Sequence, residues 1–143
     1  MRGFTLIEII LTTGIVAVLL SLTLPVGIGF YKNQQLENQG RFLSQVLRKS
    51  QQESLAGNLD SSFGVYFSST GYTLFKGNSY LSRDGLYDEV FEVPGFINIS
   101  GLPEVVFSKA EGESSVIGSI ILSFNDNQRI IDINEKGRIN LQY

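Results

Sequence analysis

The sequence predicts an α+β fold in which one long N-terminal helix packs on an antiparallel β-sheet head. Three observations predict it. A long apolar run opens the chain, a stripe of leucine and valine at helical spacing follows, and from residue 63 onward short β-prone runs alternate with turn residues. At 143 residues the chain is long enough for one globular core and an anchor, but short for two domains.

The N-terminal run is apolar enough to lie in a membrane. Between Phe4 and Tyr31 the only ionisable side chain is Glu8. A helix from Ile9 to Tyr31 would be roughly 35 Å long, and a bilayer core is roughly 30 Å thick. We therefore expect a transmembrane helix over residues 4–31, with the head outside the cytoplasm. A cleaved secretory signal is the alternative, but the run is too long and no clear cleavage site follows it.

The helix is predicted to continue beyond the apolar run as an amphipathic segment over residues 32–57. Its apolar side chains fall near one stripe and polar side chains take the other positions, which is typical of a helix on the surface of a domain. Gly57 and Asn58 would end it. Pro25, which has no backbone N–H, is the predicted site of a kink. The stripe consists of Leu36, Leu43, Val46, Leu47 and Leu55.

The second part of the chain predicts the head. Residues 69–71 are expected to form a tight hairpin turn, and residues 134–137 a turn whose final glycine supplies a positive φ. In the last run Ile139, Leu141 and Tyr143 alternate with polar residues, which predicts a half-buried antiparallel strand. The head spans residues 58–143, residues 77–87 are expected to be an excursion between sheets, and the predicted strands are 63–67, 72–76, 88–93, 97–100, 105–108, 117–124, 129–133 and 138–143.

The composition argues against several classes of function. The chain has no Cys and no His, so it lacks disulfides, the commonest zinc ligands and the usual general base near neutral pH. We therefore expect neither an enzyme nor a bound cofactor or metal. Eleven Lys and Arg against 14 Asp and Glu give a net charge of −3, which disfavours general nucleic-acid binding.

The most informative motif directly precedes the apolar run and reads Arg2-Gly3-Phe4-Thr5-Leu6-Ile7-Glu8. It resembles the signature of type IV prepilins. The resemblance implies that a membrane aspartic peptidase cleaves between Gly3 and Phe4, that Phe4 is then N-methylated, and that Glu8 is needed for assembly. Pro25 matches the helix proline of that family. The leader, residues 1–3, is shorter than most, which indicates a minimal leader or a start codon upstream of Met1.

A carboxylate such as that of Glu8 is costly inside a lipid-embedded helix, by about 3 kcal/mol at mid-helix depth. The free amino group of Phe4 in a neighbouring subunit would be a partner of the opposite charge. We hypothesise that this pair sets the stagger of incoming subunits. The alternative is that Glu8 lies near the bilayer edge, stays hydrated and caps the first turn of the helix, where acids suit the helix dipole.

The rest of the sequence is similar in places to H-type minor pseudopilins of type II secretion and to related minor pilins, at residues 48–56, 63–67 and 133–139. The resemblance implies a structural subunit of a type IV pilus or a type II secretion-like filament. Its partners would be other pilin or pseudopilin subunits, the prepilin peptidase, and an assembly platform with its ATPase motor. The subunit would be a single-pass protein of the inner membrane before it joins a periplasmic or cell-surface filament.

Other patterns have competing interpretations. Residues 125–127 and Asp132 could hold calcium, but they fit no EF-hand spacing, and a plain turn is favoured. Arg129, Lys136 and Arg138 could contact DNA, but three cations in an acidic domain favour solvated strand positions. The main alternative function is a single-span, membrane-anchored extracytoplasmic binding domain that does not polymerise and keeps an intact N-terminus.

Overall fold

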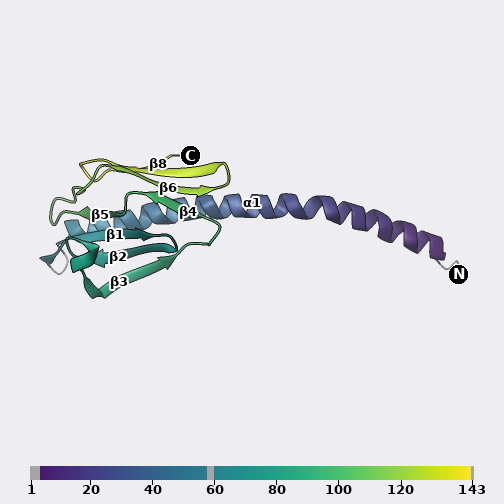
Figure 1. The fold of residues 1–143 in the computed structure, drawn as a ribbon, viewed down its shortest axis with the longest axis horizontal. Coiled ribbons are helices and arrows are strands. Elements are labelled where there is room, and N and C mark those ends of the chain that lie inside the picture. Colours follow the sequence, from purple (N-terminus) through teal and green to yellow (C-terminus); the bar gives the residue numbers. More distant parts are fainter. Residues whose placement is uncertain (1–3, 58–59, 143) are drawn as a thin grey trace. The chain divides into compact units, whose positions relative to one another are not determined.

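The computed structural model describes residues 4–57 and 60–142, and of residues 22–26 only the backbone. Helix α1 runs from Leu6 to Leu55 and is followed by a β-rich region (Figure 1). Contacts divide the chain into two compact units, Met1–Gln34 and Gln35–Tyr143, so that α1 contributes to both. The first unit is helical from Leu6 onward, and the second, which includes the C-terminal part of α1, is the head.

Each of the eight predicted runs forms a strand, with ends that differ by a few residues. The strands are β1 (Phe63–Ser68), β2 (Gly71–Lys76), β3 (Asp84–Glu92), β4 (Asn98–Gly101), β5 (Glu104–Phe107), β6 (Gly118–Phe124), β7 (Asn127–Ile133) and β8 (Ile139–Gln142). They form two four-stranded antiparallel sheets: sheet A has the order β3-β2-β1-β5, and sheet B the order β4-β6-β7-β8.

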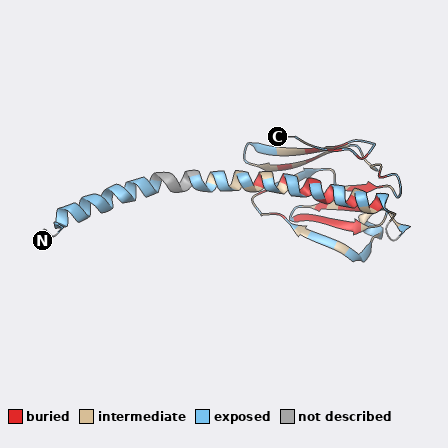
Figure 2. Cartoon of the chain, turned by 180° about the vertical axis from the view of Figure 1, so that it is seen from behind, coloured by how far each residue is buried: buried red, intermediate tan, exposed pale blue. Residues whose placement is uncertain are grey.

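Both sheets share one core with the C-terminal part of α1. The predicted helix stripe is confirmed at Leu36, Leu43, Val46 and Leu47, which are buried (Figure 2). It is wrong at Leu55, which is 48% exposed because the helix ends there. The strands contribute buried apolar side chains from both sheets, among them Val65, Leu74, Val105, Ile120, Leu122 and Ile131.

The predicted turns and the last strand have the expected geometry. Ser69–Thr70 form the two-residue connection between β1 and β2, because the neighbouring residues on either side are paired. Gly137 has a φ of +69° in the turn before β8. Ile139 is buried, Leu141 is half-buried, and the polar residues between and after them are exposed. Tyr143 lies outside the described residues.

The segment 77–87 differs from its prediction. It is not only an excursion, because Tyr80–Ser82 form a short 3₁₀ helix, η2, and β3 begins at Asp84, which pairs with Lys76 of β2. The pairing shifts register between Leu74 and Lys76. This irregularity lets a stretch rich in Gly, Asn, Ser and Asp rejoin the sheet edge, where no buried apolar pattern marks it as a strand.

A small aromatic cluster on sheet A explains why this segment is ordered. Phe75 is fully buried but is separate from the main core. The ring of Tyr80 packs edge-on against Phe75, with centroids 5.6 Å apart, and stacks on Tyr66 at 3.9 Å. The guanidinium of Arg83 lies 3.7 Å from the centre of the Tyr80 ring. These contacts hold η2 over Phe75.

Replacing Tyr72 with phenylalanine is expected to stabilise the head. The Tyr72 hydroxyl is buried with no hydrogen-bond partner among the described residues, and burial raises the pKa of this phenol. Removing it should raise the free energy of unfolding by about 1 kcal/mol, because the desolvation penalty of an unpaired hydroxyl disappears. Denaturant unfolding followed by circular dichroism would measure the change. Tyr66→Phe, at a half-buried position, is the control, and a destabilised Tyr72→Phe would contradict the prediction.

Candidate functional site

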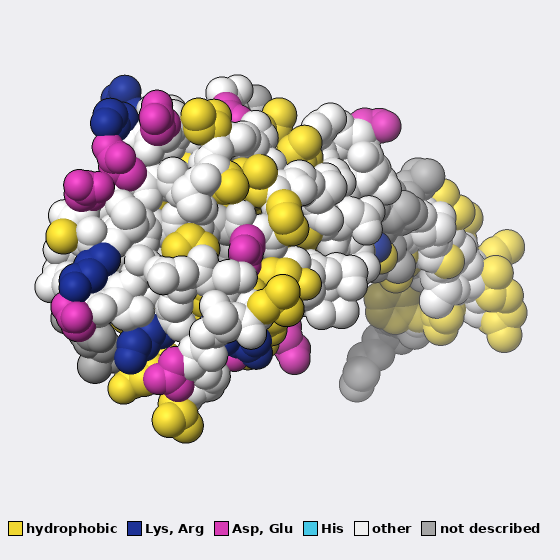
Figure 3. All heavy atoms as spheres, turned by 60° about the vertical axis from the view of Figure 1, so that its left-hand side comes forward, with side chains coloured by type: hydrophobic (Ala, Val, Ile, Leu, Met, Phe, Trp, Pro, Cys, Tyr) yellow, Lys and Arg dark blue, Asp and Glu magenta, His cyan; other side chains and the backbone are white. Residues whose placement is uncertain are grey.

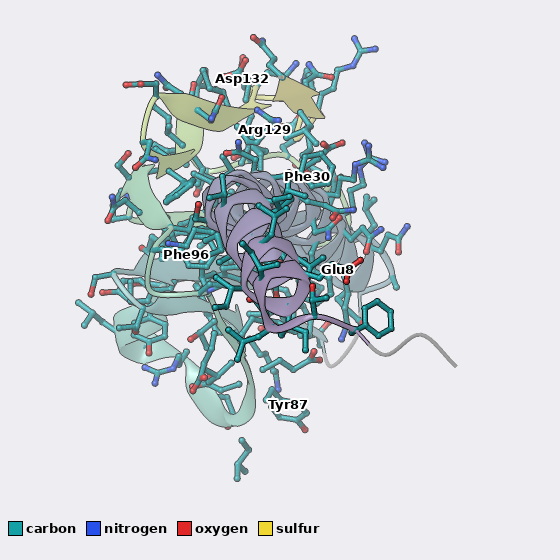
Figure 4. The ribbon with its side chains drawn as sticks, turned by 90° about the vertical axis from the view of Figure 1, so that its right-hand side faces the viewer. Glu8, Phe30, Tyr87, Phe96, Arg129 and Asp132 are labelled. Carbon is teal, nitrogen blue, oxygen red and sulfur yellow. The ribbon has the colours of Figure 1, made fainter. Side chains whose placement is uncertain are left out.

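The N-terminal segment closes a capping box at the start of α1. The backbone N–H and the hydroxyl of Thr5 both donate to Oε2 of Glu8 at 3.2 Å. In return the backbone N–H of Glu8 donates to the Thr5 hydroxyl at 3.4 Å. These reciprocal bonds satisfy donors that the start of a helix leaves free, and the carboxylate lies at the positive end of the helix dipole (Figure 4).

The structure brings Glu8 together with Thr5, which the sequence interpretation missed. The spacing Thr-x-x-Glu before an apolar run is a recognised start signal and could have identified Thr5. Phe4 directly precedes the capping box and its side chain is 85% exposed. Gly3 lies outside the described residues, as does the side chain of Pro25. In the single chain Glu8 therefore has the capping role, and its role in assembly stays a prediction.

The first unit presents an apolar surface on all sides of the helix. Residues 4–21 are all exposed. Because apolar residues stand at nearly every successive position, they cover the whole circumference of a helix with 3.6 residues per turn, which is typical of a helix surrounded by lipid or by other helices. The exposed large apolar side chains include Phe4, Leu6, Ile7, Ile9, Ile10, Leu11, Ile15, Val16, Val18, Leu19 and Leu20. Within the described part of the chain, no helix combines the length and apolar character needed to cross a membrane.

The hydroxyl groups of this segment bond to their own helix. Thr12 and Thr13 donate to the carbonyls four residues before them, at 2.8 and 2.6 Å, and Ser21 donates to the carbonyl of Val18 at 2.7 Å. Such bonds satisfy the hydroxyls without solvent. The hydroxyl residues are uncharged, and the carboxylate of Glu8 is the single charged side chain between Phe4 and Tyr31.

Two of the candidate metal and DNA residues of the head, Asp132 and Lys136, are held in local contacts, and two others form a turn. Asn125 and Asp126 form the turn between β6 and β7, as predicted. Asp132 accepts hydrogen bonds from Ser119 and Gln142, both at 2.5 Å. Lys136 pairs with Glu113 at 2.5 Å. Among the described residues no group of three metal-ligating side chains was found. On the face shown in Figure 3, acidic and basic side chains are interspersed.

The comparisons with known proteins give a likeness of fold. No family model matches the sequence, and no curated protein matches it. Among solved structures, the chain is similar to the minor pseudopilin EpsH from the Type 2 Secretion System of Vibrio cholerae, with a TM-score of 0.57 over 76% of this chain and 96% of that chain. The chain has the fold of that minor pseudopilin. At 12% identity the likeness concerns the fold alone, and it confirms the predicted pilin-like α+β architecture.

Proposed function

We propose that the chain is a structural subunit, a minor pilin or pseudopilin, of a type IV pilus or a type II secretion-like filament. The observation that carries the proposal is the continuity of α1. An apolar, fully exposed helix continues as the helix on which a head with a minor-pseudopilin fold is built. A subunit of this design needs no enzymatic activity and no cofactor, because its work is to pack against other subunits.

The first step of the proposal is maturation at the N-terminus. A prepilin peptidase would cut between Gly3 and Phe4 and methylate the new amino group of Phe4. Before maturation the subunit would span the inner membrane through residues 4–31, with the head on the extracytoplasmic side. The exposure of Phe4 ahead of the first helical turn is compatible with access by a peptidase.

The second step is assembly of the matured helix into a filament core. An assembly platform and its ATPase motor would move the subunit from the membrane into contact with other pilin or pseudopilin subunits. Glu8 would pair with the Phe4 amine of a neighbour, since it is the one charge on an apolar surface and an unpaired charge there is costly. Pro25 would give the helix the bend that packing requires.

The intact mass of the chain recovered from membranes tests the proposal. With its prepilin peptidase present, we expect loss of residues 1–3 and the gain of one methyl group. Without the peptidase the mass should be that of the unprocessed chain, and Gly3→Val, which places a branched side chain at the cleavage site, should behave in the same way. An unprocessed chain beside an active cognate peptidase would favour the alternative, a membrane-anchored binding domain that does not polymerise.

A further inference from the structure

A groove with a basic lining lies between the end of α1 and the turn that leads into β8. It is an open surface depression with a volume of about 530 Å³. The helix supplies four side chains at i, i+3, i+4 and i+7 spacing, which places them on one face. The lining residues include no carboxylate and are Arg48, Gln51, Gln52, Leu55, Lys136, Gly137, Arg138, Ile139 and Asn140.

Two arginines supply the unused positive charge of this groove. Most other cations of the head form ion pairs, for example Lys49 with Glu89. Arg48 and Arg138 are exposed and have neither an ion pair nor a side-chain hydrogen bond among the described residues. Lys136 also lines the groove, but Glu113 pairs with it and raises its pKa. The two guanidinium groups are therefore available for a carboxylate, which they bind well.

The wall that carries Arg138 is fixed to the helix. Nε2 of Gln51 donates to the carbonyl of Gly112 at 2.8 Å and to that of Gly137 at 3.0 Å. The backbone N–H of Arg138 donates to the side chain of Asn134 at 2.9 Å. The backbone beside the groove is thus held before any partner arrives, which lowers the entropy cost of binding.

The same chain carries a projecting acid at the other end of sheet B. Asp126 lies in the two-residue turn between β6 and β7, is exposed, and has no ion pair or hydrogen bond among the described residues. This turn lies beyond Arg129, and Arg129 packs against Gly40 of α1, where an added Cβ would be 3.2 Å from the Cβ of Arg129. From Gly40 to Gln51 is about 16 Å of helix, so turn and groove are well separated.

We propose that the Asn125–Asp126 turn of one copy docks into this groove of a second copy, with the Asp126 carboxylate between Arg48 and Arg138. The inference rests on the proposed function, because it assigns a head-to-head contact within the filament. Turn and groove are different surfaces on opposite ends of the head, so the contact is heterologous. A heterologous contact leaves a free turn on one copy and a free groove on the other.

Cysteine cross-linking of full-length chains tests this contact, and the natural sequence contains no cysteine to confuse it. Two differently tagged copies, one with Asn127→Cys and one with Asn140→Cys, should form a disulfide when co-expressed with the assembly machinery and oxidised. Each variant paired with a tagged copy of itself should not, because turn does not meet turn and groove does not meet groove. Both substitutions leave the proposed charges in place.

Charge reversal decides whether the proposed pair holds the contact. Asp126→Arg in the Asn127→Cys copy should reduce the cross-linked fraction about tenfold, since like charges then face each other. Adding Arg138→Glu to the Asn140→Cys copy should restore it. Matured subunits that sediment with filaments but do not cross-link, or that cross-link regardless of charge, would overturn the docking contact and leave the proposed function standing. Chains that are neither matured nor assembled would overturn both.

Discussion

Glu8→Gln is expected to abolish incorporation of the subunit into filaments while leaving the start of α1 intact. Glutamine preserves the capping box, because its side-chain oxygen still accepts from Thr5. It removes the negative charge that would pair with the Phe4 amine of a neighbour. The fraction of the variant that sediments with sheared filaments measures the effect, and intact mass establishes that maturation is unchanged.

Thr5→Ala is the matched control, because it weakens the cap and keeps the charge. We expect it to cost about 1 kcal/mol of helix stability at the N-terminus. It should still enter filaments once matured, since the Glu8 carboxylate remains available for the neighbouring amine. If Glu8→Gln assembled like the parent chain, or if Thr5→Ala failed as completely as the charge-removing variant, Glu8 would act through capping rather than pairing.

Gly137→Ala is expected to destabilise the head by about 2 to 5 kcal/mol. The residue has a φ of +69°, and a left-handed conformation costs a residue with a Cβ about 1–2 kcal/mol. The new Cβ would also overlap the carbonyl oxygen of Gly112 and Nε2 of Gln51. Relieving that overlap breaks one or both hydrogen bonds of the Gln51 amide, which adds about 1–3 kcal/mol. Denaturant unfolding of the full chain measures the loss.

Gly57→Ala separates backbone strain from overlap. Gly57 has nearly the same φ, +62°, but an added Cβ there meets no atom of the described residues within 4 Å. This variant should lose only the strain of about 1–2 kcal/mol. Equal losses in the two variants would show that the turn before β8 can move away from the helix, and that the Gln51 bonds do not hold it.

Most of the fold was predictable because its signals are local. Alternation in the last strand, the glycine of the turn before it and the leucine stripe of α1 each follow from the geometry of one element. Residues 84–87 were missed because their place in β3 depends on pairing with β2 after a register shift, and no local apolar pattern marks them as a strand. Leu55 was assigned to the core by periodicity, which does not reveal where the core stops along a helix.

The functional and structural side chains also fall into two kinds: some are marked by a local motif, and others are brought together only by the fold. Phe4 and Glu8 are marked by a contiguous motif, whereas the bonds of Gln51 to two turns join residues far apart in sequence. The helix also buries hydroxyl residues where periodicity would place apolar ones, and Ser54 shows why. Its hydroxyl accepts from the backbone N–H of Phe63 at 2.9 Å and donates to the carbonyl of Ser50 at 3.1 Å. That role is invisible until the first strand is placed beside the helix.

The hydroxyl groups of Thr12, Thr13 and Ser21 donate to carbonyls of their own helix, so these hydrogen bonds are kept when the helix moves. When such a segment moves from one apolar medium to another, the hydroxyl groups keep the same carbonyl partners. No hydroxyl is left without a hydrogen bond during the transfer. Their contribution to the barrier for extraction is therefore small, whether the medium is hydrocarbon tails or the side chains of other helices. Glu8 differs from these hydroxyl residues because its side chain carries a full charge, the single one between Phe4 and Tyr31. Under the proposed function, such a helix would leave lipid readily, and the charge of Glu8 would fix the depth at which it packs in the filament.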